Sequence, residues 1–243
     1  MKTLTLMLTL TAALICNRPF AAPSIVKGGD SSFAVIELFT SEGCSSCPPA
    51  DHLIAQLREA DTARQLYILA FHVDYWDHQG WKDRFSQAAW SQRQQAYATW
   101  LNRRQIYTPQ LIVNGTSEHI GSDANAVTTA LSAALAASGD RQLRISAAID
   151  GKFIDISHTN TRNNLQLALV QKDGRSNVRR GENAGSELVH VQIVRELITV
   201  RAGETGNVRM RSPQDFDAKT WELIGFVQDA ESGRITDAAR CTW

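Results

Sequence analysis

The sequence predicts an α/β domain over residues 23–139, followed by a small antiparallel β-rich domain of sandwich type over residues 140–243. Up to about residue 137, apolar runs of strand length alternate with helical patterns, which is typical of an α/β layer arrangement. Beyond that point, helical periodicity gives way to short β-like runs separated by turn residues.

Residues 1–22 have the pattern of a bacterial secretory signal peptide. Lys2 provides a short basic start, residues 4–15 are apolar, and residues 19–22 end in small side chains suited to cleavage. The apolar stretch is shorter than a membrane-spanning helix requires. We therefore expect cleavage after Ala22 and a periplasmic or secreted mature protein.

The net charge and the hydropathy of the mature chain bear on which partners it is expected to have. Removal of Lys2 and Arg18 with the signal peptide leaves 23 basic residues against 25 acidic ones, so the mature chain is close to neutral. A near-neutral chain gives no reason to expect nucleic acid or an anionic membrane surface as partner. No later segment approaches the ~20 apolar residues of a membrane span, so we expect none after signal cleavage.

The first half begins with a strand, a helix and a second strand. Residues 33–39 are a mostly apolar run, and residues 51–60 then place Leu53 and Leu57 one helical turn apart. Residues 66–71 are apolar throughout, as in a strand covered on both faces.

A second helix, a strand and a third helix follow. Residues 83–105 are predicted as one long helix with Trp90 and Tyr97 on its apolar stripe. Residues 109–113 read as a strand, and the Ala-rich residues 125–137 as a helix.

The second half is predicted to be built from short strands. Residues 145–149 and 153–156 form a hairpin in this prediction, because Asp150-Gly151 supplies the positive φ angles of a two-residue turn. Further strands are predicted at residues 165–170, 189–194, 197–201 and 221–227.

Cys44-Ser45-Ser46-Cys47 lies at the predicted junction between the first strand and the first helix. Unpaired N–H groups and the helix dipole stabilise a thiolate at such a junction. The spacing lets the two sulfurs form a disulfide, with Cys44 as nucleophile and Cys47 as the resolving thiol. Because prolines cannot donate to a helix, Pro48 and the proline after it predict that regular helical bonding starts beyond them.

The order of these elements resembles that of thioredoxin-like proteins. Thr108-Pro109 precedes a strand, and Asn114-Gly115 then predicts a hairpin turn. The resemblance implies that Pro109 is cis and lies beside the dithiol, with Thr108 and Pro109 shaping the substrate groove. It covers residues 33–138, which is nearly all of the first half.

Five segments carry a more specific resemblance. Leu-Phe-Thr-Ser-Glu-Gly-Cys-Ser-Ser-Cys-Pro-Pro-Ala-Asp at 38–51 is followed by His-Val-Asp-Tyr-Trp-Asp at 72–77 and Gly-Trp-Lys-Asp at 80–83. Together with residues 107–110 and 179–185, these segments are similar to an uncharacterised family of secreted bacterial proteins, domain of unknown function 1223. This resemblance covers almost the whole mature chain, implies a thioredoxin-like fold and supplies no substrate.

The leading hypothesis is a thiol-disulfide oxidoreductase that needs no cofactor and no metal, with protein or small-molecule thiols and disulfides as partners. Its groove or active site would be lined by Ser45, Ser46, His72, Asp74 and Trp76.

Three other interpretations stay open at this stage. The couple could be a structural disulfide in a non-catalytic interaction protein, because export favours oxidation. Alternatively, the dithiol could bind copper(I) with ligands from His72, Asp74, Asp77 and His78. In the third interpretation, Asp74 and Asp77 cap a turn, and His72 is a loop histidine with its hydrogen bonds satisfied. Cys241 is expected to be a buried spare thiol.

Overall fold

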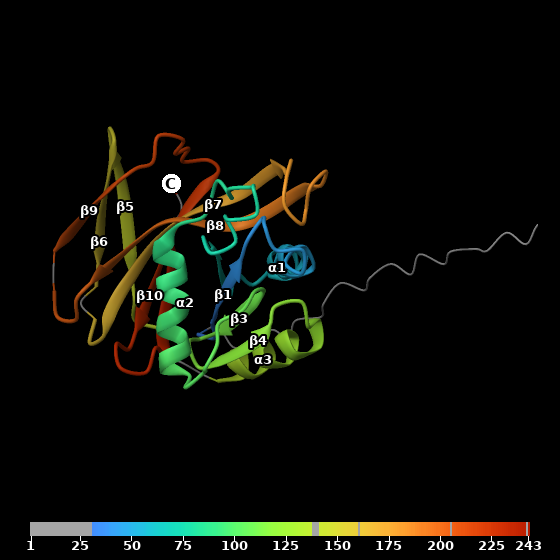
Figure 1. The fold of residues 1–243 in the computed structure, drawn as a ribbon. Coiled ribbons are helices and arrows are strands. Elements are labelled where there is room, and N and C mark those ends of the chain that lie inside the picture. The colour runs from blue at the N-terminus through green and yellow to red at the C-terminus, as the bar shows by residue number, and fades with distance from the viewer. Residues whose placement is uncertain (1–30, 138–140, 160, 205, 242) are drawn as a thin grey trace, which may run out of the picture.

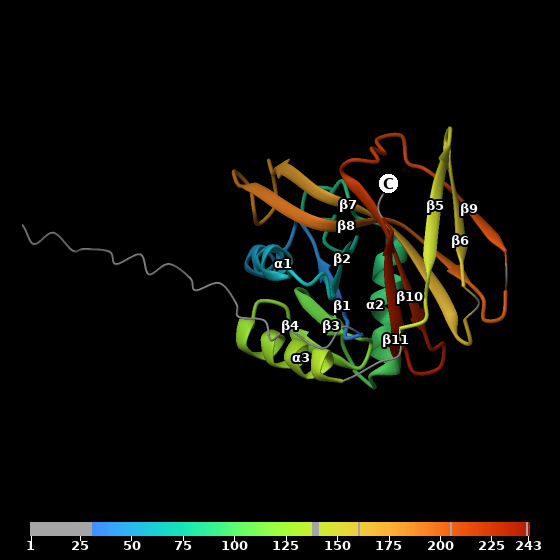
Figure 2. The same cartoon turned by 180° about the vertical axis from the view of Figure 1, so that it is seen from behind.

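The protein has a mixed α/β fold in a computed structural model that describes residues 31–137, 141–159, 161–204, 206–241 and 243 (Figures 1 and 2). The predicted signal peptide and the predicted domain boundary at 139 and 140 lie outside the described residues. The helices are α1 (Pro48–Ala60), α2 (Ala88–Trp100) and α3 (Ala124–Ala136). The strands are β1 (Ala34–Thr40), β2 (Leu66–His72), β3 (Gln110–Val113), β4 (Ser117–Ile120), β5 (Ile145–Asp150), β6 (Phe153–His158), β7 (Asn164–Asn177), β8 (Glu187–Val200), β9 (Asn207–Arg211), β10 (Trp221–Gln228) and β11 (Ile235–Cys241).

One large sheet crosses the whole molecule. Its eight strands have the order β11-β10-β7-β8-β2-β1-β3-β4, and β5-β6-β9 form a separate three-stranded antiparallel sheet. β2 is parallel to both β1 and β8, and the other described pairs are antiparallel. The pairing of Ala70 in β2 with Ile193 in β8 joins the two halves of the chain.

Alternate residues of the large sheet face two different layers, because side chains along a strand point to opposite sides. On one face, Val35 and Phe39 pack with Trp90 and Tyr97 of α2. On the other face, α1 and α3 cover β1, β2 and β3, and the three-stranded sheet covers β7 and β10. The sheet is therefore buried on both sides over most of its length.

Both hairpins predicted from turn residues form, one of them with a shifted turn. Asn114 and Gly115 both have positive φ, and Val113 pairs with Ser117 across this turn. The β5–β6 hairpin also forms, but Asp150 pairs with Phe153, so the two loop residues are Gly151 and Lys152 instead of Asp150-Gly151.

The helix predicted over residues 83–105 is wrong at both ends, since α2 covers only Ala88–Trp100. Before it, the Asp83 carboxylate accepts a hydrogen bond from Phe85 N, and Ser86 Oγ donates to Asp77, so these residues form a turn. After it, Asn102 has a φ of 52°, which a right-handed helix does not allow.

The predicted start of the first helix is also corrected, because α1 begins at Pro48. Proline is compatible with the first helical turn, where backbone N–H groups have no intrahelical acceptor. The helix therefore begins directly after Cys47.

The second half is not a separate sandwich. Four of its strands continue the sheet of the first half, and only β5, β6 and β9 form a sheet of their own. The runs predicted at 189–194 and 197–201 belong to one strand, β8, which pairs with β7 along 14 residues. Sequence patterns specify which segments are strands but not which distant strands they pair with. Within the described residues, no helix is long and apolar enough to cross a membrane.

Candidate functional site

Cys44 and Cys47 form a disulfide at the beginning of α1, with their Cα atoms 5.5 Å apart. β1 ends at Thr40, and a short turn carries the chain to the helix. Both cysteines are buried, Cys44 at 1% and Cys47 at 0% exposure, whereas Ser45 and Ser46 between them are exposed. The predicted dithiol therefore lies at a helix N-terminus, where the backbone dipoles favour negative charge.

The Thr108–Pro109 peptide bond is cis and lies against this disulfide. Thr108 Oγ1 donates a hydrogen bond to Cys44 Sγ over 3.3 Å, and Trp76 Nε1 donates to Thr108 Oγ1 over 2.8 Å. Ser46 Oγ donates to the Thr108 carbonyl over 3.4 Å. Five of the predicted site residues, Cys44, Ser46, Trp76, Thr108 and Pro109, are thus brought together.

The loop between β7 and β8, in the second half of the chain, is hydrogen-bonded to the turn that carries Cys44. Asn183 Nδ2 donates to the carbonyls of Glu42 and Cys44 over 2.9 and 3.0 Å. The carboxylate of Glu182, the residue before it, accepts from Ser45 N over 3.0 Å. The loop therefore restricts access to Cys44.

An Asn183→Ala variant is expected to let a small dithiol reduce the disulfide roughly tenfold faster. Each lost hydrogen bond contributes about 1 kcal/mol, and about 1.4 kcal/mol changes an opening equilibrium tenfold. The measurement is the rate of thiol release with dithiothreitol, with Arg175→Ala as a control because Arg175 is an exposed partner of Glu187 farther along the same hairpin. An unchanged rate for Asn183→Ala would show that the loop does not limit access.

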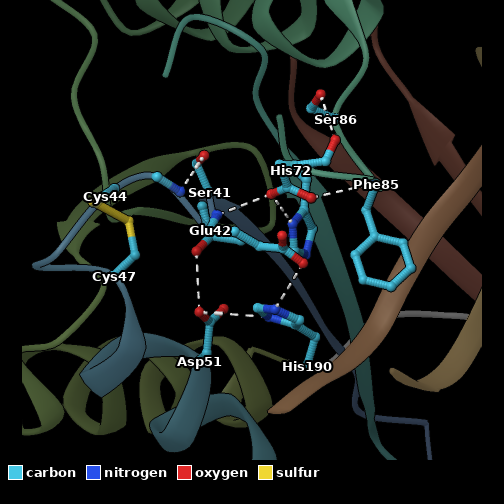
Figure 3. A network of polar contacts seen from close by, with 12 residues as sticks. Ser41, Glu42, Cys44, Cys47, Asp51, His72, Phe85, Ser86 and His190 are labelled. Carbon is cyan, nitrogen blue, oxygen red and sulfur yellow. Dashed lines mark hydrogen bonds and ion pairs between the residues drawn. A yellow bond between two sulfur atoms is a disulfide. The ribbon is translucent and has the colours of Figure 1, made fainter. Parts of the chain in front are cut away.

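Behind the disulfide, Asp83 holds a buried set of hydrogen bonds (Figure 3). Its carboxylate lies 2.7 Å from His72 Nδ1, and it accepts from Glu42 N and Phe85 N, both over 2.9 Å. Burial by itself raises the pKa of Asp83, but the opposing effects of His72 and the backbone donors lower the pKa below its usual value. Asp83 thus joins the end of β2 to the turn that carries the cysteines.

His190, from β8, lies between two further buried carboxyl groups (Figure 3). Its Nε2 is 3.5 Å from Glu42 Oε1, and its Nδ1 is 3.8 Å from Asp51 Oδ2. Its ring also makes an edge contact with the ring of His72, with centroids 4.7 Å apart. The second oxygen of Glu42 accepts from Trp81 Nε1 over 2.7 Å. Five ionisable side chains therefore share one buried region: Glu42, Asp51, His72, Asp83 and His190.

The pKa of Asp51 is strongly raised in this buried region. Its burial raises the pKa from 3.8 to about 7, with smaller upward contributions from Asp83 and Glu42. His190 and the hydrogen bond from Thr40 Oγ1 act in the opposite direction. Strong desolvation next to a charged partner is common at functional sites.

Other predicted site residues lie away from the disulfide or have other partners. Asp74 accepts a hydrogen bond from Ser91 at the start of α2, and His78 Nδ1 contacts the Tyr75 carbonyl. His72 is the buried last residue of β2 and its Nδ1 is engaged by Asp83. In the part of the chain that the structure describes, no group of three or more His, Cys, Asp or Glu side chains is placed to hold a metal ion.

Sequence reasoning did not identify the roles of Glu42, Asp51, Asp83, His190 and Asn183. One signal was available for Asp51, because a residue four positions after Cys47 lies on the same face of the helix. No local pattern marks His190, a single polar residue in an otherwise β-like run.

Comparisons with known proteins give a family match and similar solved structures. The family profile described as "Protein of unknown function (DUF1223)" matches residues 35–228. A crystal structure of a protein from Agrobacterium tumefaciens is 26% identical, with a TM-score of 0.66, and the match covers 85% of this chain and 92% of that one. A domain of the outer membrane lipoprotein Omp28 from Porphyromonas gingivalis is 19% identical over 41% of this chain and 86% of that one, with a TM-score of only 0.20. No curated protein matches the sequence.

Proposed function

The chain belongs to the family described as "Protein of unknown function (DUF1223)", and we propose that it is a thiol-disulfide oxidoreductase acting through Cys44 and Cys47. In this proposal the first half is thioredoxin-like, and the signal-like residues 1–22 direct the protein to the periplasm or the exterior. The partners are proteins or small molecules that carry thiols or disulfides.

The observation that carries the proposal is the contact between the disulfide and the cis Thr108–Pro109 peptide. The 3.3 Å hydrogen bond from Thr108 Oγ1 reaches the sulfur of Cys44, the first cysteine of the pair. The same hydroxyl can stabilise the thiolate that forms when the disulfide is reduced. A disulfide that served only as a staple would not require a hydrogen-bond donor aimed at one sulfur.

The order of elements also supports a thioredoxin-like arrangement. β1, the disulfide, α1, β2, α2, the cis proline, β3, β4 and α3 follow one another in the chain. In the proposed reaction, a substrate thiolate attacks Cys44 Sγ, and Cys47 leaves with the electron pair of the S–S bond. In the reverse direction Cys47 resolves the mixed disulfide at Cys44.

The experiment that tests the proposal is the reduction potential of the Cys44–Cys47 couple. The purified protein is equilibrated with glutathione buffers of different ratios, and its free thiols are counted. We expect a potential between about −120 and −230 mV, the range of exchange-active couples. A disulfide that stays closed below about −300 mV would instead identify a structural staple.

A further inference from the structure

A pocket of about 370 Å³ lies near the end of helix α1 that is remote from the disulfide. Its lining includes four arginines and one tyrosine: Arg64, Tyr67, Arg141, Arg144 and Arg240. Among the described residues that line it, none is Asp or Glu. Like charges gathered at one place repel one another, so this arginine pocket favours an anion as counter-charge.

We infer that the arginine pocket binds a small soluble anion that carries two or more negative charges on phosphoryl groups, as pyrophosphate does. The inference goes beyond the proposed function. The 13 residues of α1 separate the pocket from Cys47, and at 1.5 Å per residue this is roughly 20 Å. The site therefore uses neither sulfur, and it stands even if the cysteine couple is a structural disulfide.

Segments that are distant in the chain build the arginine pocket. Arg64 follows α1, and Arg240 lies in β11. Arg141 and Arg144 come just before β5. Tyr67 of β2 contacts two of them, because the guanidinium carbons of Arg141 and Arg240 are 5.5 and 5.1 Å from the centroid of its ring. Cation–π contacts of this kind hold both guanidinium groups beside one aromatic side chain.

The arginines are oriented by hydrogen bonds that use only some of their donors. Arg141 Nη2 donates to the Tyr67 hydroxyl and, over 3.2 Å, to the carbonyl of residue 238. Arg144 Nη1 donates to the carbonyl of residue 143 over 3.1 Å, and Arg240 Nη2 to that of residue 66 over 2.8 Å. Each guanidinium has five N–H donors in a planar fork, so others remain for a ligand.

The positive charge of the pocket is compensated only in part. Among the described residues, Arg240 is the one of the four arginines with an ion pair, since its Nε lies 3.0 Å from Glu222 Oε2. The carboxylates of Asp61 and Asp237 also act on Tyr67, but each already accepts hydrogen bonds from two backbone N–H groups of its own neighbourhood. An anion that enters the pocket therefore meets unpaired guanidinium charge.

The donor set favours phosphoryl groups over a single carboxylate. One guanidinium fork can bind two oxygens of either group, so one arginine satisfies a carboxylate. Several guanidinium groups around one pocket suit an anion with more oxygens and more charge. Burial raises the pKa of Tyr67, so its hydroxyl stays protonated and can donate a further hydrogen bond.

The test is calorimetric titration of the full protein with pyrophosphate in a buffer without divalent metal ions. We expect one pyrophosphate to bind per chain with a Kd below about 1 mM at low salt, and to bind more weakly as salt is added. The absence of saturable binding in this range would overturn the inference.

Two variants assign the binding to the arginine pocket. Arg64 and Arg144 are exposed, so their replacement should leave the fold intact. Arg64→Gln and Arg144→Gln are each expected to raise the Kd about tenfold, because a hydrogen bond to a charged group is lost. Arg211→Gln is the matched control, since Arg211 is an exposed arginine of β9 outside this pocket, and its Kd should equal that of wild type. An equal effect of all three variants would show that the binding is not confined to the pocket.

Two further probes test the class of ligand. Citrate carries comparable negative charge on carboxylates and should bind at least tenfold more weakly than pyrophosphate. Vesicles of phosphatidylcholine that contain phosphatidic acid present a phosphoryl group on a surface, and the protein should not sediment with them. Citrate binding as tight as that of pyrophosphate would contradict the phosphoryl assignment. Binding to the vesicles without binding of pyrophosphate would contradict a soluble ligand.

Discussion

The Cys44→Ser variant is expected to lose disulfide exchange by roughly three orders of magnitude or more, since removal of a nucleophile eliminates the covalent pathway. Cys44 is the sulfur that accepts the Thr108 hydroxyl, and it lies under the loop that Asn183 holds in place. The measurement is the rate at which the purified protein reduces or oxidises a mixed-disulfide peptide in a glutathione buffer.

The Cys47→Ser variant should behave differently from Cys44→Ser. With Cys44 intact and no resolving thiol, the reaction stops at the mixed disulfide, which can be isolated on a non-reducing gel. Cys241→Ser is the matched control, because Cys241 lies outside the disulfide at the end of β11. Full activity in Cys44→Ser would contradict the proposed function, as would an equal loss in the Cys241→Ser control.

The second large effect is expected for Asp83→Ala, which should reduce the free energy of unfolding by about 3–5 kcal/mol. The change removes the acceptor of two backbone N–H groups and the partner of His72, all of them buried. Buried donors that lose their acceptor retain the full cost of desolvation. Urea unfolding with the disulfide intact measures the difference.

The loss of unfolding free energy caused by Asp83→Ala is expected to depend on pH. The native pKa of Asp83 is lower than in the unfolded chain, so its contribution is present at neutral pH and is lost as pH falls through the native pKa. The gap between wild type and Asp83→Ala should therefore narrow in acid. Asp215→Ala is a suitable control, because Asp215 forms an exposed ion pair with Arg195 and should cost less than about 1 kcal/mol. A loss no larger than that of the control would refute the structural role given to Asp83.

The local elements were largely predictable from the sequence. The apolar run of β2 and the Asn114-Gly115 turn both depend on neighbouring residues. The ends of α2 were not predictable, because the side chains of Asp77, Asp83 and Ser86 bond to the turn before the helix. Side-chain bonds of this kind compete with helical bonding and leave the apolar periodicity unchanged.

The residues of the candidate site were also predictable only in part. Cys44, Cys47, Thr108 and Pro109 were identifiable, since each belongs to a short motif with a physical meaning of its own. The interpretation of His72 as a loop histidine was wrong, because the residue ends β2 and is fully buried. Its partner Asp83 follows it by 11 residues, across a turn that no periodic pattern describes.

By itself, the sequence determined the Cys-x-x-Cys pair and the alternation of strands and helices around it, because these follow from chemistry within a few residues along the chain, whereas the place of Pro109 beside the pair was expected only from the resemblance. Only the tertiary structure decided that β8 pairs with β2 and extends the same sheet. That pairing brings His190 to Asp51 and Asn183 to Cys44, across 139 residues in each case. Backbone pairing is satisfied equally well by many strands, so the choice of partner depends on how whole faces pack and not on any local pattern.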